Sequence, residues 1–141
     1  MPDKSLTIGQ VLALLAEAPL RLEALTAGLA PARLQATPND GEWSANDVLA
    51  HLRACADVWG GCIAAILAEE RPTLRTVNPR TWIERTDYRE LEFRPSLRAF
   101  AAQRAELLAV LEPLRLEDWS RAATVTGAGR PLERTVLSYA R

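Results

Sequence analysis

The sequence contains few of the side chains that most often carry out chemistry. Its 141 residues include one histidine (His51), one lysine (Lys4), one methionine and two cysteines. It has no Gly-x-Ser-x-Gly nucleophile elbow and no phosphate-binding glycine loop with a following lysine. A Ser-His-Asp arrangement would have to use His51 with Asp47, and Asp47 is better explained as part of a helix cap. The sequence alone therefore gives little support to serine hydrolases and nucleotide-binding enzymes.

The chain also lacks a large excess of charge and a long apolar run. Its formal net charge of -1 argues against nucleic-acid binding, which usually requires a strongly basic protein. The longest apolar run, Val58–Ala68, contains two glycines and is far shorter than the ~20 residues that a membrane span needs. The first residues lack the basic and apolar regions of a signal peptide. We expect a cytoplasmic protein with neither a nucleic-acid nor a membrane partner.

The two cysteines are predicted to remain reduced. Cys55 and Cys62 lie seven residues apart on one expected helix, which separates them by roughly 10 Å along its axis. This separation is too large for a disulfide. We expect both to be buried thiols.

Charge is distributed unevenly along the chain. Residues 71–104 contain eight arginines and four acidic residues, a local balance of +4, whereas residues 1–70 carry four basic and nine acidic groups. Two interpretations stay open for the positive segment. It either attracts anions toward a site or is a solvated connection followed by a helix face.

Alanine and leucine supply 46 positions (24 plus 22), which favours helix. Strands are expected to be a minor component, because alternating runs of β-branched residues are scarce. A single all-α domain over residues 1–141 is therefore predicted. Apolar spacing of three and four residues predicts its long helices. They cover residues 6–25, 44–68 and 96–111, and a last, short helix is expected to start at Leu132 or Glu133.

The connections between these helices are marked by proline, asparagine and glycine. Residues 29–42 are expected to be a connection with a turn at Asn39-Asp40-Gly41, and a second turn is expected at Gly127-Ala128-Gly129. Residues 70–95 form the least regular region, in which Asn78-Pro79 can open a short helix. Pro19 lies inside the first helix, where it removes a backbone donor and is expected to cause a kink.

The second helix has the clearest start in the sequence and contains His51. Ser44 is a good N-cap, and Asp47 lies where a carboxylate can complete a capping box. Cys55 follows His51 at the i+4 position, so the pair either supplies two metal ligands from one helix face or is a core cysteine beside a partly buried histidine. Gly60-Gly61 indicates a closely packed neighbour or a break in the helix.

The helix start resembles that of the DinB/YfiT-like superfamily, a group of four-helix-bundle metalloenzymes that includes mycothiol- and bacillithiol-dependent transferases. The resemblance rests on motifs in a characteristic order along nearly the whole chain. These motifs are Gly28-Leu29, Glu42-Trp43-Ser44, Val48-Leu49-Ala50-His51-Leu52, Phe100 with Arg104, Leu107–Leu111, Leu116-Glu117-Asp118-Trp119-Ser120-Arg121, and Gly127–Gly129 leading into Thr135-Val136-Leu137.

The resemblance implies an up-down-down-up bundle with a long crossover and a fourth helix that is short or truncated here. It also implies that His51 is one of three histidine ligands to a divalent metal such as zinc or nickel. In the family the other two come from a His-x-x-x-His pair on the fourth helix. This sequence has no second histidine. We therefore expect either a longer gene product that contains the pair or a member that has lost its metal.

Three functions follow as hypotheses. The first is a metal-dependent transferase or hydrolase that acts on a small molecule and uses a low-molecular-weight thiol, with the metal acting as a Lewis acid. The second is a metal-free binding or stress-response module. The third is a structural dimer without catalytic activity, and a homodimer is expected because an incomplete fourth helix leaves apolar surface uncovered.

Overall fold

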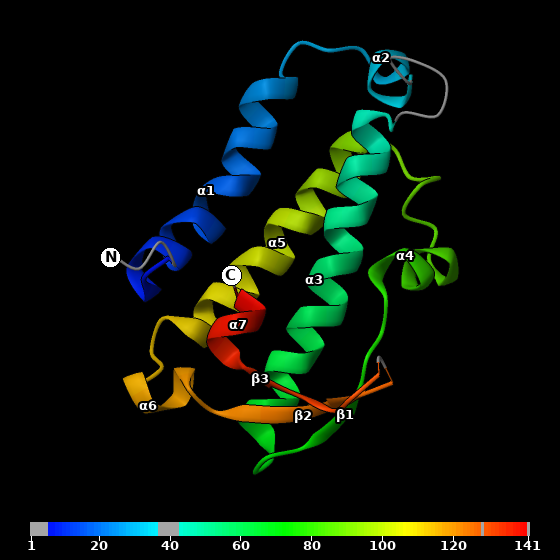
Figure 1. Ribbon diagram of the computed structural model, residues 1–141. Coiled ribbons are helices and arrows are strands. Elements are labelled where there is room, and N and C mark those ends of the chain that lie inside the picture. Colours follow the sequence, from blue (N-terminus) through cyan, green and yellow to red (C-terminus); the bar gives the residue numbers. More distant parts are fainter. Residues whose placement is uncertain (1–5, 37–42, 128, 141) are drawn as a thin grey trace, which may run out of the picture.

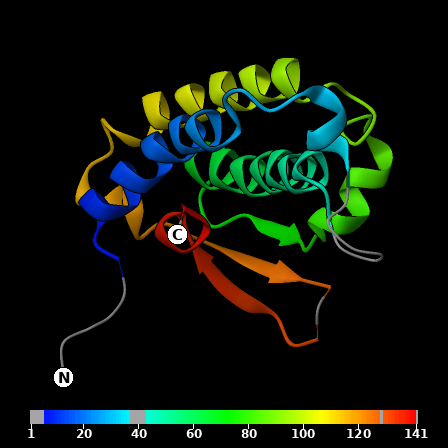
Figure 2. The same ribbon diagram turned by 90° about the horizontal axis from the view of Figure 1, so that it is seen from above.

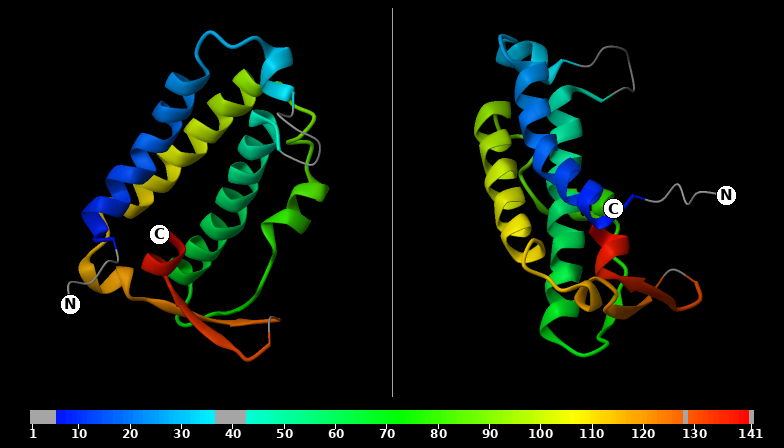
Figure 3. Two further views of the ribbon diagram at one scale, coloured as in Figure 1. Left: turned by 45° about the horizontal axis from the view of Figure 1, so that its top comes forward. Right: turned by 90° about the vertical axis from the view of Figure 1, so that its left-hand side faces the viewer.

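Three long helices form the framework of the molecule in a computed structural model that describes residues 6–36, 43–127 and 129–140 (Figure 1). Helix α1 packs on α5, α5 packs on α3, and the short α7 packs on α3. Helices α3 and α5 run in the same direction, whereas α1 and α7 run opposite to them (Figures 1 and 3). This is the predicted up-down-down-up bundle. Its helices are α1 (Ile8–Thr26), α3 (Ala45–Ala68), α5 (Phe93–Leu111) and α7 (Val136–Ala140).

A long crossover joins the two parallel helices α3 and α5. It carries strand β1 (Thr73–Arg75), helix α4 (Pro79–Trp82) and the 3-10 turn η1 (Ile83–Arg85). The Asn78 side chain accepts a hydrogen bond from the Arg80 backbone N–H at 2.9 Å, with Pro79 at the first helical position. The short helix predicted at Asn78-Pro79 is therefore confirmed.

A three-stranded sheet lies at one end of the bundle, below α7 in Figure 1 and beside it in Figure 2. Its order is β1-β2-β3, with β1 parallel to β2 and β2 antiparallel to β3. Gly127 and Gly129, both with positive φ, lie in the connection between the two antiparallel strands. The remaining elements are α2 (Pro31–Gln35), α6 (Leu116–Trp119), β2 (Ala122–Thr126) and β3 (Leu132–Thr135).

The start predicted for the last helix is wrong. Leu132 and Glu133 belong to β3 and pair with β2, and the helix begins only at Val136. Its cap is Thr135, whose hydroxyl accepts a hydrogen bond from the Ser138 backbone N–H at 3.1 Å. The apolar pattern of this segment is too short to distinguish helix from strand, so pairing with β2 decides its conformation.

Two other boundaries differ from the prediction. Helix α2 occupies part of the expected connection 29–42, and the turn expected at Asn39-Asp40-Gly41 lies outside the described residues. Helix α5 starts at Phe93 rather than Ser96. Pro95 does not prevent this start, because the first turn of a helix has no intrahelical partner for its N–H groups.

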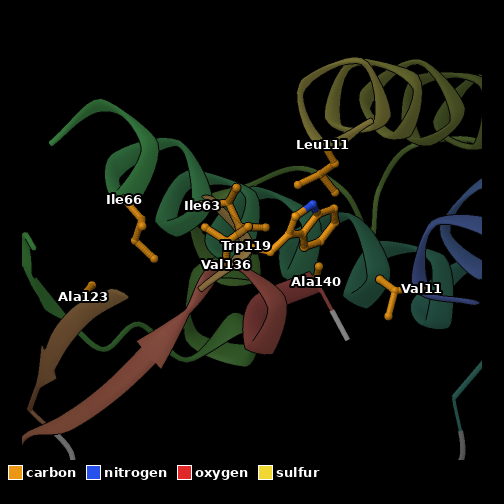
Figure 4. Packing of buried hydrophobic residues seen from close by; sticks show 8 residues of the cluster. All are labelled: Val11, Ile63, Ile66, Leu111, Trp119, Ala123, Val136 and Ala140. Atoms are coloured by element: carbon orange, nitrogen blue, oxygen red, sulfur yellow. The ribbon is translucent and has the colours of Figure 1, made fainter. Parts of the chain in front are cut away.

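The largest core cluster forms where α1, α3, α5 and α7 meet α6 and β2. Figure 4 shows the Trp119 side chain in the middle of the cluster, near Ile63 and Leu111, with Ala123 and Val11 at its two sides. A second cluster around Phe100 joins α2, α3 and α5. The members of the first cluster are Val11, Ile63, Ile66, Leu111, Trp119, Ala123, Val136 and Ala140.

Helix α3 is buried on more than one face. Ala50 and Ala54 are fully buried against Ile83 of the crossover, and they form a third cluster. By length and composition alone, α3 is the one helix within the described ranges that can cross a membrane. A core helix of a soluble protein meets the same criterion, and α3 contacts α2, α4, α5 and α7.

Candidate functional site

An apolar pocket of about 430 Å³ opens between α1, α3, α5 and α7. Leucines from α1 and α5, including Leu14 and Leu107, line its walls. Helix α3 continues through Gly60, where an added Cβ would meet nothing within 4 Å, so neither the close neighbour nor the break expected there occurs. Gly60 instead borders the pocket. The polar side chains that reach the pocket are His51, Cys55, Arg104 and Tyr139.

The capped start of α3 positions His51. Ser44 accepts a hydrogen bond from the Asp47 backbone N–H at 3.0 Å, and the Asp47 carboxylate accepts one from the Ser44 N–H at 3.1 Å. The predicted capping box is therefore confirmed, and α3 begins at Ala45 as expected. About two turns later, the His51 side chain reaches the pocket.

His51 lies between a thiol and an indole ring. Its Nε2 is 3.5 Å from the Cys55 Sγ, and its ring centroid is 5.2 Å from that of Trp43 at an interplanar angle of 57°. The i+4 spacing does bring His51 and Cys55 together. These contacts limit the orientations that the imidazole can take while leaving it beside the pocket.

Both cysteines are free, as predicted, and Cys55 is buried, but Cys62 is only partly buried, in contrast to the prediction. Burial raises the pKa of the Cys55 thiol, and it raises the pKa of Cys62 despite an opposing hydrogen bond with Tyr139. Burial and the nearby Cys62 raise the pKa of Tyr139 to about 12. A thiol with a raised pKa is mostly protonated at neutral pH and is a poor nucleophile. Cys55 is thus an inert neighbour of His51 unless a metal deprotonates it.

The described residues do not complete a metal site. Within residues 6–36, 43–127 and 129–140, no group of three or more histidine, cysteine or acidic side chains is placed to hold an ion. His51 and Cys55 supply two donors at most, whereas catalytic zinc sites use three protein ligands. The assignment of His51 as a metal ligand therefore stays a prediction.

Asp57, one turn beyond Arg53 on α3, is the centre of a polar cluster that is not predicted from the sequence. Its carboxylate accepts hydrogen bonds from the Trp82 indole at 3.1 Å, the Gln103 amide at 2.6 Å and the Tyr88 hydroxyl. The Arg53 guanidinium lies 4.0 Å from the centroid of the Tyr88 ring. The cluster fastens the crossover and α5 to α3.

Arg104 is a polar residue of the site that is not predicted from the sequence. It lies on α5 in the apolar stripe formed by Phe100, Leu107 and Leu111. An arginine within such a stripe was the sequence signal that could have indicated a residue of the site. Its Nη1 donates a hydrogen bond to the Leu15 carbonyl at 2.9 Å. Burial lowers the pKa of its guanidinium.

Two other arginines of residues 71–104 contact distant parts of the chain. Arg94 donates hydrogen bonds to the Thr26 hydroxyl, at 2.9 Å, and to the Thr26 carbonyl at the end of α1. Arg71 pairs with Glu133 at 3.2 Å. Among the arginines of this segment, Arg104 is the one that lines the pocket.

Comparisons with known proteins agree with this architecture. A curated relative from Geobacillus thermodenitrificans (strain NG80-2), named "Putative metal-dependent hydrolase", is 26% identical over 133 residues, covering 90% of this chain and 71% of the relative. The solved structure of YfiT from Bacillus subtilis is described as a probable metal-dependent hydrolase with an unusual four-helix bundle topology. It matches with a TM-score of 0.72 at 20% identity, covering 99% of this chain and 81% of YfiT. The model of the DinB superfamily matches residues 14–141. The chain therefore belongs to the DinB superfamily, as the motifs around Trp43-Ser44 and His51 predict.

Proposed function

We propose that this protein is a metal-dependent hydrolase that binds a small molecule in the pocket beside His51. The observation that carries the proposal is the placement of the single histidine at this pocket, on a helix start that a capping box fixes. The names of the Geobacillus relative and of YfiT support the same class of activity. His51 is the first metal ligand in this proposal.

The pocket would contribute binding and orientation. Its apolar walls favour the apolar part of a substrate and exclude water from that part of the site. A bound divalent metal would supply Lewis-acid chemistry. Since the described residues offer His51 and Cys55 alone, such a metal needs at least one further ligand from outside them.

Metal binding and hydrolysis test this proposal together. We expect the purified full-length protein to carry about one divalent metal per chain by elemental analysis, and to hydrolyse some member of a panel of esters and amides. His51→Ala should weaken Zn²⁺ binding, measured by calorimetry, by at least about tenfold, because it removes a direct ligand. Val48→Ala, an exposed position on the same helix, serves as the control and should change neither readout.

Two results would contradict the proposal. One is full-length protein without stoichiometric metal after expression in metal-supplemented medium. The other is His51→Ala protein with unchanged metal affinity and unchanged hydrolysis. If His51→Ala also left ligand binding and stability unchanged, the metal-free binding module would be the better description.

A finer form of the proposal is that a low-molecular-weight thiol is the nucleophile or acceptor. It rests on the resemblance of the helix start to a family that includes thiol-dependent transferases, and burial raises the pKa of Cys55 and Cys62, which makes the chain's own thiols poor nucleophiles. We expect bacillithiol or mycothiol to be consumed with an electrophile such as monochlorobimane faster in the presence of the protein than without it, and His51→Ala to remove the acceleration. An unchanged rate of thiol consumption would reject the thiol and leave hydrolysis standing.

A further inference from the structure

Arg104 is held at the pocket by a defect in the hydrogen bonding of α1. In a regular helix the Leu15 carbonyl would accept a hydrogen bond from the N–H four residues later, but that residue is Pro19, which has no N–H. The Arg104 Nη1 takes this place at 2.9 Å. The free carbonyl thus anchors one end of the guanidinium.

A second contact restrains the guanidinium. Its Cζ lies 4.9 Å from the centroid of the Phe100 ring, and Phe100 is fully buried one turn earlier on α5. An aromatic ring at this distance attracts a cation and restricts its motion. The Arg104 side chain is therefore held by two contacts before any ligand arrives.

These contacts leave most of the hydrogen-bonding capacity of Arg104 unused. The Nε is buried and has no hydrogen-bond partner. The two ion pairs found within the described ranges, Arg21–Glu17 and Arg71–Glu133, do not involve it. A guanidinium has five N–H donors and stays charged in proteins. Arg104 as a whole is partly buried, and a partly desolvated guanidinium without a counter-ion at an apolar pocket favours an anion.

We propose that Arg104 binds the carboxylate of an otherwise apolar small molecule whose body occupies the pocket. Leu14, Leu107 and Ala56 supply the apolar walls of the pocket, and Arg104 supplies its one fixed positive charge among the described residues. A carboxylate matches the planar fork of a guanidinium and can accept two parallel hydrogen bonds from it. This inference rests on the proposed function in one respect, that the pocket beside His51 is the substrate site.

The inference can be tested with 4-phenylbutyrate and its neutral amide, 4-phenylbutyramide. The two probes share an apolar body and differ in charge. By calorimetry, we expect the wild-type protein to bind the carboxylate at least about tenfold more tightly than the amide, because hydrogen bonds to a charged group are the stronger ones. Equal affinities, or no binding of either probe, would overturn the inference without the need for any variant.

Substitutions of Arg104 and Arg98 test whether the preference for the carboxylate depends on Arg104. Arg104→Gln keeps an N–H donor but removes the charge, and it should abolish the preference for the carboxylate over the amide. Arg98→Gln removes an exposed arginine from the same helix and should preserve the preference. A preference that survives in Arg104→Gln would overturn the inference.

If circular dichroism shows that Arg104→Gln does not fold, Arg104→Lys replaces it. Lysine keeps the charge without the planar fork, so it should weaken the preference, and an unchanged preference would overturn the inference.

The effect of Arg104 must be distinguished from that of a bound metal, since a metal at His51 would also attract a carboxylate. Each titration is therefore repeated after treatment with EDTA and with His51→Ala protein. We expect the preference to persist in both. A preference that disappears in both would assign the carboxylate to the metal, which would overturn this inference and support the proposed function. If the protein never binds metal and the preference depends on Arg104, the result would support this inference and contradict the proposed function.

Discussion

At the scale of single residues, the carboxylate of Asp57 joins three parts of the chain. Its partners Trp82, Tyr88 and Gln103 lie 25, 31 and 46 residues away in sequence. Burial and the hydrogen bond to Asp57 raise the pKa of Tyr88 to about 12. The protonated Tyr88 hydroxyl is therefore part of what holds the crossover on α3.

This pKa predicts a loss of stability at alkaline pH. Because the pKa of Tyr88 is higher in the folded protein than its ordinary value of 10.0, its contribution is complete below pH 10 and is lost as the pH rises toward 12. Tyr139, whose pKa is also about 12, contributes with the same sign. Urea unfolding of the wild-type protein across this range should show the decline, and Tyr88→Phe should make it less steep.

Trp82→Phe is the matched control for the alkaline experiment. It removes a hydrogen bond to the same Asp57 carboxylate, but the indole does not titrate in this range. It should lower stability at every pH and leave the slope between pH 10 and 12 as in the wild type. A slope that Tyr88→Phe leaves unchanged would show that Tyr88 stays protonated equally in both states.

The residues of the site differ in how far the sequence predicts them. The closeness of His51 and Cys55 follows from helix geometry, because residues four apart lie on one face. The Asp57 cluster could not be predicted in this way, since its partners come from a crossover whose path depends on tertiary packing. Arg104 lies between these cases. The absent N–H of Pro19 implies an unpaired Leu15 carbonyl, but only the packing of α5 on α1 shows which donor reaches it.

At the scale of elements, the capping box of α3 is the feature that places His51. Ser44 is buried and its hydroxyl satisfies one of the unpaired N–H groups of the first turn. We expect Ser44→Ala to lower the free energy of unfolding by about 1 kcal/mol, measured by urea denaturation. Ser44→Thr keeps a hydroxyl and should cost less. Equal stability of the wild type and Ser44→Ala would show that the cap contributes nothing.

Helix boundaries were predictable where the chain carries its own start signal. Ser44 with Asp47, and Asn78 with Pro79, mark two starts that the structure confirms. The last helix was predicted too early because Leu132–Thr135 is held as a strand by pairing with β2, a contact that local pattern does not contain. The Thr135 cap was visible in the sequence and was the better signal.

At the scale of the whole molecule, apolar side chains remain exposed toward the end of α1. Leu20 is 66% exposed and Leu25 is 77% exposed. A homodimer, predicted from the sequence, would cover such surface. We expect light scattering to give twice the 15.5 kDa mass of the chain. Leu25→Lys should shift the protein toward monomers, and Leu116→Lys, also at an exposed leucine, should not. A monomeric wild-type protein would contradict the prediction.

The parallel arrangement of α3 and α5 has a consequence for how the chain folds. Two parallel helices cannot form a local hairpin, and the pairing of β1 with β2 joins Thr73 to Thr124 across the whole of α5. Closing these long loops reduces the conformational entropy of the chain before the distant contacts can compensate for it. Folding should therefore be slower than for an up-down bundle of equal size, and β1 should be among the last segments to acquire protection from hydrogen exchange.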